Sequence, residues 1–474
     1  MKKIFIVALC LLVQCAFANE LYSIKIEKNQ KIQGTLSAEL SGNATLHFVY
    51  TKNSDTRKFE ILTVFVDSDK KTKQLDTFEA DEIPSLLSYH RNGSTVTLAN
   101  FYEKKKELQR IDFDVKTGKF QMAVTKDFKE PKNIFRLSNR TLFVDFDKTK
   151  NKLTTTSFSD SKEIKEDLFE FTKDEFNLFK SFFTETPEAV NQDEFVKNGS
   201  ISKRKGYVSG DKLIFTSEKD KSNTQVLTLN LDGSKGYKFA DFDFNYGKEI
   251  KDQNTFVSEN KLLSVGVSKE DLVLNSFDMT TNKASKSVSL QKDLSKKFDS
   301  DTRQRFIESA AKSAMRPTVT FNRTKDSKFL VRLDRVNKTT YNYSHNWWHL
   351  HWMMHQQMIF QQQQIMMRQQ QQMMRQSVPR GFGPNPSYYD ALAMIGFEKS
   401  EIKPIEFVVD LDFTVDENAS TETLYKSVDQ DDYLEKYKDN KSLKEFTASF
   451  TNTDLRYIYF DKKAETVYLK LENL

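Results

Sequence analysis

Cysteine is nearly absent from this 474-residue chain, and its two cysteines, Cys10 and Cys15, both lie within the first 18 residues. The rest of the chain therefore has no disulfide, no thiol nucleophile and no cysteine-based zinc or redox centre. A chain without disulfides must be stabilised by its own core. The length permits this, because chains above about 300 residues bury roughly three quarters of their surface.

Glycine and proline are also scarce, at 14 and 8 residues. Sequence motifs of catalytic sites are absent: there is no Gly-x-Ser-x-Gly elbow, no His-Glu-x-x-His pair and no glycine-rich phosphate loop. Outside one unusual segment the only histidines are His47 and His90, which we interpret as surface residues of strands. A Ser-His-Asp triad would have to use one of them. We therefore predict no catalytic residue, and the sequence favours a non-enzymatic role.

The charges are balanced and interspersed. The net charge is +5 for the full chain, which implies no attraction to nucleic acid or to a membrane surface. After residue 18 no apolar run approaches the ~20 residues that a membrane-spanning helix needs. We expect no nucleic-acid partner and no transmembrane segment once the leader is removed.

The first 18 residues have the features of a signal peptide. Met1-Lys2-Lys3 is a short basic region, residues 4–17 form an apolar run, and Ala16-Phe17-Ala18 fits a cleavage site. We therefore predict that the protein is exported to the periplasm, the cell surface or the medium. Lipidation at Cys15 is an alternative that we rank lower, because Gln14 is a poor residue before a lipidated cysteine.

The body of the chain is predicted to be mainly β. Residues 95–102, 108–115 and 119–124 are strand-like runs with apolar and polar residues in alternation, separated by polar turns. The same pattern of three runs recurs twice, at 212–217, 225–231 and 237–242, and at 261–267, 271–277 and 284–290. The turns between the runs recur every 45–50 residues, a spacing typical of repeated units with three or four strands each.

This succession of strands and turns resembles that of exported β-propeller-like repeat proteins. It does not indicate a named family. The resemblance covers roughly residues 40–335 and the C-terminal 75 residues, and it implies about six or seven blades. The chain has no Trp-Asp dipeptide, no double glycine of the Kelch type and no Asp-box. A large β-sandwich or barrel is the alternative fold.

Three helices are expected to interrupt the strands. Thr172-x-x-Glu175 is a capping box that leads into a stripe formed by Phe176, Phe179 and Phe183. A second helix is expected over 301–315 and should end at Pro317. A third is expected over 433–446.

Pairs of aspartates two residues apart recur on strand-like segments, where both carboxylates would lie on one face. Paired acids could serve glycoside hydrolysis or Ca²⁺ binding. Because the pairs are distributed along the body, we interpret them as turn-forming residues. The pairs are Asp67/Asp69, Asp112/Asp114, Asp145/Asp147, Asp241/Asp243 and Asp410/Asp412.

One segment of about forty residues differs sharply in composition, with all three tryptophans, four of the six histidines and seven of the twelve methionines. His345 and His349 are four residues apart, as are His351 and His355, and a helix would place each pair on one face. Imidazole suits Zn²⁺ and Cu²⁺, and the thioether of Met354 suits Cu(I). Copper or zinc binding here is an alternative to a structural role, since no carboxylate or cysteine completes a ligand shell.

The same segment has a heptad repeat of apolar residues between glutamines, as in a coiled coil. No glycine or proline occurs from 346 to 378, so we expect one helix of about thirty residues that ends at Pro379. Disorder is the alternative, because glutamine-rich segments are often unfolded. The predicted interaction stripe consists of Trp348, Trp352, Ile359, Met366 and Met373.

The expected organisation is a signal peptide at 1–18, a propeller-like body at 19–341, the helical insert at 342–388 and completion of the body at 389–474. The expected function is that of an exported, non-enzymatic binding or scaffold protein of the cell envelope or extracellular space. Its partner would be a protein or an envelope surface, met through the Gln/Met-rich helix. The alternatives are metal binding through the insert, and a hydrolase with acidic residues at a propeller mouth.

Overall fold

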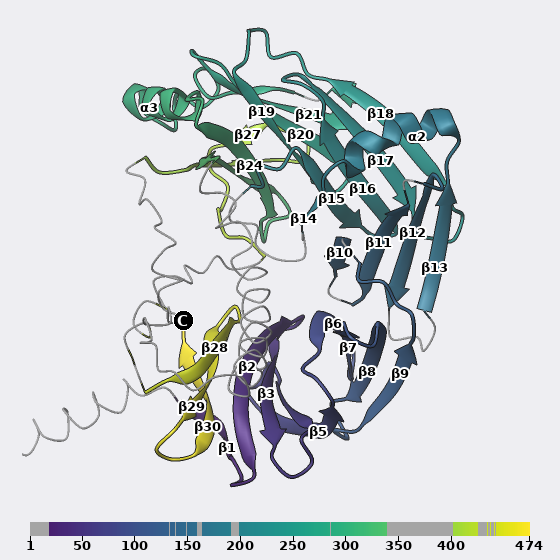
Figure 1. Ribbon diagram of the computed structural model, residues 1–474. Coiled ribbons are helices and arrows are strands. Elements are labelled where there is room, and N and C mark those ends of the chain that lie inside the picture. Colours follow the sequence, from purple (N-terminus) through teal and green to yellow (C-terminus); the bar gives the residue numbers. More distant parts are fainter. Residues whose placement is uncertain are drawn as a thin grey trace, which may run out of the picture.

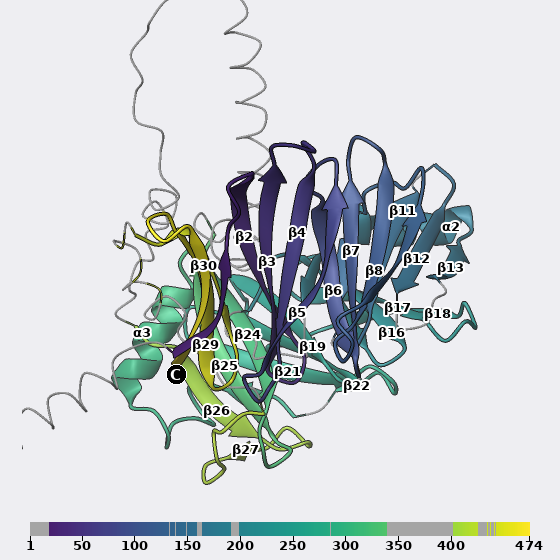
Figure 2. The same ribbon diagram turned by 90° about the horizontal axis from the view of Figure 1, so that it is seen from below.

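The computed structural model describes residues 19–338 and 402–474, except 132, 138, 148, 159–163, 191–198, 285, 425–433, 435, 436, 438, 439 and 441. The described residues form seven β-sheets that lie around a common centre (Figure 1). Viewed from below, the sheets of the first half stand side by side with their strands upright (Figure 2). This radial arrangement is that of a β-propeller with seven blades, which confirms the predicted fold and sets aside the sandwich and the barrel.

Sheets 1 to 3 each contain four strands in sequential order, all antiparallel. Sheet 1 consists of β2 (Gln30–Leu40), β3 (Ala44–Asn53), β4 (Phe59–Val66) and β5 (Thr72–Ala80). Sheet 2 consists of β6 (Ser85–Asn92), β7 (Thr95–Tyr102), β8 (Glu107–Asp114) and β9 (Phe120–Thr125). Sheet 3 consists of β10 (Asn133–Arg136), β11 (Thr141–Asp147), β12 (Lys152–Phe158) and β13 (Ile164–Glu170).

Sheets 4 to 6 follow the same meander, with small additions. Sheet 4 consists of β14 (Glu188–Val190), which is parallel to its neighbour, β15 (Arg204–Ser209), β16 (Lys212–Glu218), β17 (Asn223–Asn230) and β18 (Tyr237–Asp243). Sheet 5 consists of β19 (Asp252–Ser258), β20 (Lys261–Val267), β21 (Leu272–Asp278), β22 (Lys283–Ala284) and β23 (Val288–Ser289). Sheet 6 consists of β24 (Met315–Arg323), β25 (Phe329–Asn337), β26 (Ile405–Val409) and β27 (Val415–Asp416).

Sheet 7 joins the two ends of the described chain. It consists of β28 (Lys444–Phe450), β29 (Asp454–Asp461) and β30 (Thr466–Asn473), with β1 (Asn19–Lys25) antiparallel to β30 at its outer edge. Residues more than four hundred positions apart are thus paired in one ladder. If the N-terminal strand β1 unfolds, the C-terminal sheet loses its outer strand.

The first strand of each sheet faces the centre, and these inner strands connect the blades. β2 contacts both β28 and β6, β10 contacts both β6 and β14, and β19 contacts β24. Apolar side chains fill the spaces between neighbouring sheets: one cluster joins sheets 1 and 2, another joins sheets 3 and 4, and the largest spans sheets 4 to 6. The core is therefore divided among the interfaces between blades, as expected for units that cannot bury their surface alone.

Two helices are described over their whole length, and both begin near the predicted positions. α2 (Lys173–Phe179) begins at Thr172 with a complete capping box and continues as the 3-10 turn η1 (Lys180–Phe183), so the predicted helix tightens in its last turn. α3 (Ser300–Ala310) begins at Asp299 and ends five residues earlier than predicted. Pro317 does not terminate it but lies inside β24.

The third predicted helix is wrong at its C-terminal end, because Lys444–Phe450 is strand β28. Phe446 packs beside Tyr457 of β29 in the core of sheet 7. Most of 433–443 lies outside the described residues, but Leu434 and Tyr437, which are described, are helical as predicted. The run predicted over 284–290 also differs, since it forms the two short strands β22 and β23 in place of one.

The capping box of α2 gives a first testable prediction. The Thr172 hydroxyl accepts from the Glu175 amide at 3.3 Å, and a Glu175 carboxylate oxygen accepts from the Thr172 amide at 2.8 Å. Thr172→Ala should lower the free energy of unfolding by about 1 kcal/mol, because an amide of the first turn loses its acceptor. Denaturant unfolding followed by circular dichroism measures the change. Thr172→Ser, which keeps the hydroxyl, should recover most of it, and an equal loss in both variants would contradict this cause.

Candidate functional site

The residues predicted for metal binding and for the interaction stripe all fall in 339–401, outside the described residues. They stay predictions: His345, His349, His351, His355 and Met354 as ligands, and Trp348, Trp352, Ile359, Met366 and Met373 as contacts. Within the described part of the chain, no group of three or more His, Cys, Asp or Glu side chains is placed to hold a metal ion.

In four of the five aspartate pairs, one carboxylate accepts from a backbone amide in a turn, as predicted; these residues are Asp67, Asp114, Asp147 and Asp410. The fifth pair differs, because Asp241 and Asp243 accept from the Asn223 side chain of the neighbouring strand. The Asp114 carboxylate accepts from the Lys116 amide at 2.8 Å, and that of Asp147 accepts from the Thr149 amide at 2.9 Å. The hydrogen bond from Lys116 lowers the pKa of Asp114 below its ordinary value, and the Thr149 hydroxyl does the same for Asp147. These carboxylates stabilise the reversal of the chain.

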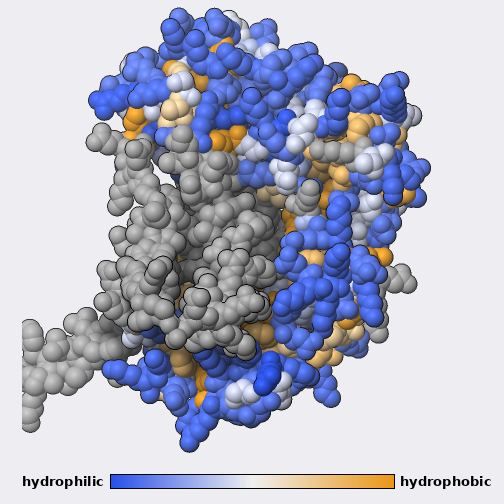
Figure 3. Space-filling view, viewed as in Figure 1, coloured by the Kyte–Doolittle hydropathy of each residue, from blue (hydrophilic) through white to orange (hydrophobic). Residues whose placement is uncertain are grey.

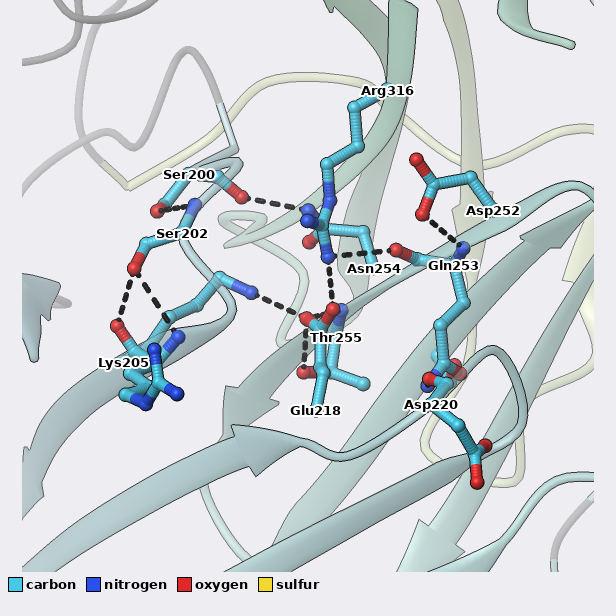
Figure 4. A network of polar contacts seen from close by, with 12 residues as sticks. Ser200, Ser202, Lys205, Glu218, Asp220, Asp252, Gln253, Asn254, Thr255 and Arg316 are labelled. Atoms are coloured by element: carbon cyan, nitrogen blue, oxygen red, sulfur yellow. Dashed lines mark hydrogen bonds and ion pairs between the residues drawn. The ribbon is translucent and has the colours of Figure 1, made fainter. Parts of the chain in front are cut away.

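A buried cluster of charges joins sheets 4, 5 and 6 around Glu218, the last residue of β16 (Figure 4). One carboxylate oxygen of Glu218 accepts from Lys205 Nζ at 2.8 Å and from both the amide and the hydroxyl of Thr255 at 3.0 Å. The other accepts from Arg316, which also donates to the Gln253 carbonyl at 3.0 Å. One carboxylate therefore receives donors from β15, β19 and β24.

This cluster has perturbed electrostatics but is closed to solvent. The side chains of Lys205 and Glu218 are each 1% exposed and that of Arg316 is 5% exposed. Burial lowers the pKa of Lys205, and the carboxylate of Glu218 opposes that shift. A lysine with a lowered pKa is a feature of some catalytic sites, but here its amine is enclosed between sheets. The arrangement is suited to holding three blades together.

A second buried polar cluster lies where sheet 7 meets sheet 1. His47 is fully buried, which shows that its assignment to the surface was wrong; His90 is also buried, at 3% exposed. The His47 ring nitrogens lie 2.9 Å from the Ser37 hydroxyl and 3.0 Å from the Thr45 hydroxyl. Burial, assisted by the positive charge of Arg456, lowers the pKa of His47 to about 3. The ring is therefore neutral and acts as a hydrogen-bonding link.

A solvent-open crevice lies between the outer parts of sheets 1 and 2. Its volume is about 230 Å³, and its lining consists of Lys58, Glu79, Ala80, Asp81, Tyr102, Lys105, Glu107 and Gln109. The Tyr102 hydroxyl donates to Gln109 at 2.9 Å, and burial raises the pKa of Tyr102. The ion pairs Lys58–Glu79 (3.0 Å) and Lys105–Asp81 (2.7 Å) involve half-exposed side chains. The crevice thus combines both signs of charge with an aromatic residue.

The strand β9 pairs with β8, which contributes Glu107 and Gln109 to this crevice, and it forms the outer edge of sheet 2 (Figure 1). Gln109 donates to the Met122 sulfur at 3.0 Å, which connects the crevice to β9. Met122 and Val124 are 42% and 47% exposed. The face of the molecule seen in Figure 3 is largely hydrophilic, with hydrophobic residues in small patches. An edge strand with two exposed apolar residues is thus a distinct surface feature.

β9 also differs from the other long outer strands in charge. Its sequence, Phe-Gln-Met-Ala-Val-Thr, has no charged residue. β1, β5, β13 and β18 each carry at least one lysine and one acidic residue. Charges on edge strands discourage pairing with other chains. The outer edge of sheet 2 is therefore the least protected of these five.

The sequence locates β9 but does not identify it as an edge. A strand over 119–124 is predicted from alternation alone, and its lack of charge is visible in the sequence. The signal becomes meaningful only when the strand order is known, because the same composition is ordinary in a central strand.

No protein-family model matches this sequence, and no curated protein matches it either. Among solved structures, the β-propeller domain of the Trilobed protease from Pyrococcus furiosus is 14% identical, with 64% of this chain and 79% of that chain covered and a TM-score of 0.30. Hsv2 of Kluyveromyces lactis is 10% identical, with 94% and 98% covered and a TM-score of 0.30. TolB from Acinetobacter baumannii is 9% identical, with 63% and 77% covered and a TM-score of 0.22. The fold assignment rests on the seven sheets of this chain, and none of these likenesses bears on its activity.

No helix in the described residues has the length and apolar character needed to cross a bilayer.

Proposed function

We propose that this chain is an exported, non-enzymatic binding or scaffold protein of the cell envelope or extracellular space. The observation that carries the proposal is the uncharged outer edge of sheet 2, where Met122 and Val124 are exposed. Such an edge can receive an extended segment as an additional strand. The ladder supplies affinity, and side chains that alternate along the strand supply specificity.

The direction in which the backbone N–H and C=O groups of β9 point supports the pairing of β9 with an added strand. The Asp114 amide donates to the Lys119 carbonyl at 2.9 Å, so Lys119 faces β8 with its backbone groups. In an antiparallel ladder the backbone groups of successive residues point alternately inward and outward. Phe120, Met122 and Val124 therefore direct their N–H and C=O groups away from β8, where an incoming strand can pair with them.

The place of the buried charges supports a non-enzymatic role. Glu218, Lys205 and Arg316 engage one another across three sheets. His47 contacts the Ser37 hydroxyl, which in turn lies 3.1 Å from Thr447 of sheet 7. Each of these groups has a structural use that accounts for its perturbed environment.

We propose the segment 342–388 as a second interaction element, on the strength of its sequence. The stripe through Trp348, Trp352 and Ile359 is apolar and the intervening residues are rich in glutamine. Methionine-rich stripes adapt to varied partners because the side chain is flexible and polarizable. This segment would be an interaction element in addition to the edge of sheet 2. The alternative of copper or zinc binding concerns this segment alone.

Site-specific photo-crosslinking in cells tests the proposal. A photoreactive residue at Val124 should give discrete protein adducts, because a bound strand lies against that position. A matched control at Ile164 should give none: it is 40% exposed on the outer strand β13, where Lys165 and Glu166 follow it. The same residue at Ile359 tests the insert. Absence of adducts from both Val124 and Ile359, or hydrolysis of glycoside or ester substrates by the purified protein, would overturn the proposal.

A further inference from the structure

We infer that the crevice between sheets 1 and 2 binds an organic cation with a primary ammonium or guanidinium head, such as a small free amine or the end of a lysine or arginine side chain. The inference goes beyond the proposed function and does not depend on it, because no residue of β9 lines the crevice. The lining comes from the turn before β4, the end of β5 and the residue after it, the end of β7, the turn that follows and the start of β8.

The size of the crevice limits what can enter it. Its volume of about 230 Å³ lies below the roughly 300–1,000 Å³ of sites that enclose a drug-sized ligand, so it admits one side chain or one small molecule. Tyr102 and Gln109 are its most buried polar residues, at 5% and 9% exposed. The side chains of Lys58 and Lys105 are each about half exposed, so the two lysines border the opening.

The charged residues of the lining leave one carboxylate without a counter-charge. Lys58 pairs with Glu79 at 3.0 Å, and Lys105 pairs with Asp81 at 2.7 Å. The third acid of the lining is Glu107, whose carboxylate forms no ion pair or hydrogen bond with the described residues. Because both lysines already have partners and the unmet charge is negative, the crevice favours a cation over an anion.

The electrostatic potential at the Tyr102 hydroxyl is negative as well. Burial raises the pKa of Tyr102 above its ordinary value, and three carboxylates raise it further, those of Glu82, Asp81 and Glu107. One oxygen of Glu82 lies 3.3 Å from the Lys104 amine. The other oxygen of Glu82 is buried and has no hydrogen-bond partner among the described residues. A cation beside the Tyr102 hydroxyl is therefore attracted by all three carboxylates.

The hydrogen-bonding groups of the crevice also suit a ligand that only donates. The Tyr102 hydroxyl gives its proton to the Gln109 oxygen at 2.9 Å, so the phenol oxygen can still accept. The Glu107 carboxylate likewise has only acceptors to offer. Ammonium and guanidinium groups carry donors and no acceptor, so both can bond to these two oxygens at once.

Saturation-transfer difference NMR on the purified mature protein tests the inference. The ligands are n-butylammonium and n-butylguanidinium, with butyrate as a control that has a similar chain and the opposite charge. Both cations should give signals that saturate with concentration, and butyrate should give none. Glu107→Gln should weaken cation binding at least about tenfold, because it removes the carboxylate without a partner. Lys58→Gln should strengthen binding about two- to fivefold, because it frees Glu79 from an exposed ion pair.

Glu103→Gln is the matched control, because it removes the same charge from the turn after β7 at an exposed position that does not line the crevice. It should leave the affinity for both cations unchanged. Arginine and lysine blocked at both backbone ends distinguish the sources of the cation: binding as tight as that of the butyl compounds assigns a peptide side chain, and weaker binding assigns a free amine. The inference is wrong if neither cation gives a saturable signal, if butyrate binds equally, or if Glu107→Gln binds like the wild type. The crosslinks from Val124 should persist in Glu107→Gln, so this failure is distinct from failure of the proposed function.

Discussion

Glu218→Gln is expected to lower the free energy of unfolding by about 3–5 kcal/mol, a range measured when one member of a buried ion pair is removed. The amide occupies the same space but carries no charge. Lys205 and Arg316 would then be left as two buried cations with no counter-charge, in side chains that are 1% and 5% exposed. Denaturant unfolding at neutral pH measures the loss, and the slope of the transition checks that unfolding stays cooperative.

Two controls separate charge from position. Glu259→Gln removes a carboxylate that pairs with Arg323 at 2.8 Å, where both side chains are about half exposed. Exposed pairs contribute about 0–1 kcal/mol, so this change should be small. Replacing Lys205, Glu218 and Arg316 together by Met, Leu and Met should recover much of the loss, because no unpaired charge remains buried. A Glu218→Gln protein as stable as the wild type would show that the cluster does not hold the blades together.

Local patterns in the sequence were sufficient to locate many of the elements. The run 95–102 coincides with β7, and the run 261–267 coincides with β20. Both follow from alternation at period two, which depends only on neighbouring residues. The start of α2 was predictable for a similar reason, since Thr172 and Glu175 satisfy each other's amides within one turn.

Features that depend on distant residues were not predictable. His47 was assigned to the surface because a polar residue in an alternating strand usually faces water. In this fold the middle strands bury both faces, and the two partners of His47 contact the C-terminal sheet: Thr447 lies 3.1 Å from the Ser37 hydroxyl, and Arg456 donates to the Thr45 hydroxyl at 3.2 Å. The Glu218 cluster is similar, because Arg316 reaches it from 98 positions away. The pairing of β28 with β29 also overrides a helical pattern that ends at Phe446.

The outer edge of sheet 2 shows the same contrast between features that depend on neighbouring residues and features that depend on distant ones. The absence of charge from residues 120–125 is plain in the sequence. The position of that strand at the outside of a blade is a property of the sheet order, which no local pattern fixes. The predicted insert at 342–388 is the opposite case, because the evidence for it comes entirely from its amino-acid composition.

Mild acid is expected to destabilise the protein through His47. The pKa of this ring falls from 6.5 to about 3 in the folded protein, because burial and the nearby Arg456 disfavour its charged form. The unfolded chain takes up the proton near pH 6.5, whereas the folded protein resists it until about pH 3. The stability contributed by His47 is therefore present above pH 6.5 and is lost as the pH falls toward 3. From pH 7.5 to pH 5 the loss is about 2 kcal/mol, and the full difference is about 5 kcal/mol.

The variant His47→Gln isolates this contribution. Glutamine does not titrate, and its amide can bond to the hydroxyls of Ser37 and Thr45, which lie beside the histidine ring. Unfolding free energies of both proteins at pH 7.5 and at pH 5 give the slopes, and carboxylates that titrate in this range affect both equally. The wild type should lose about 2 kcal/mol more than the variant over this interval. Because the ring lies where sheet 7 meets sheet 1, the loss would weaken the closure that joins the two ends of the chain. If the unfolding free energies of the two proteins change equally with pH, His47 takes up its proton at the same pH in the folded and unfolded states. The contact between sheets 7 and 1 would then be insensitive to acid through this residue.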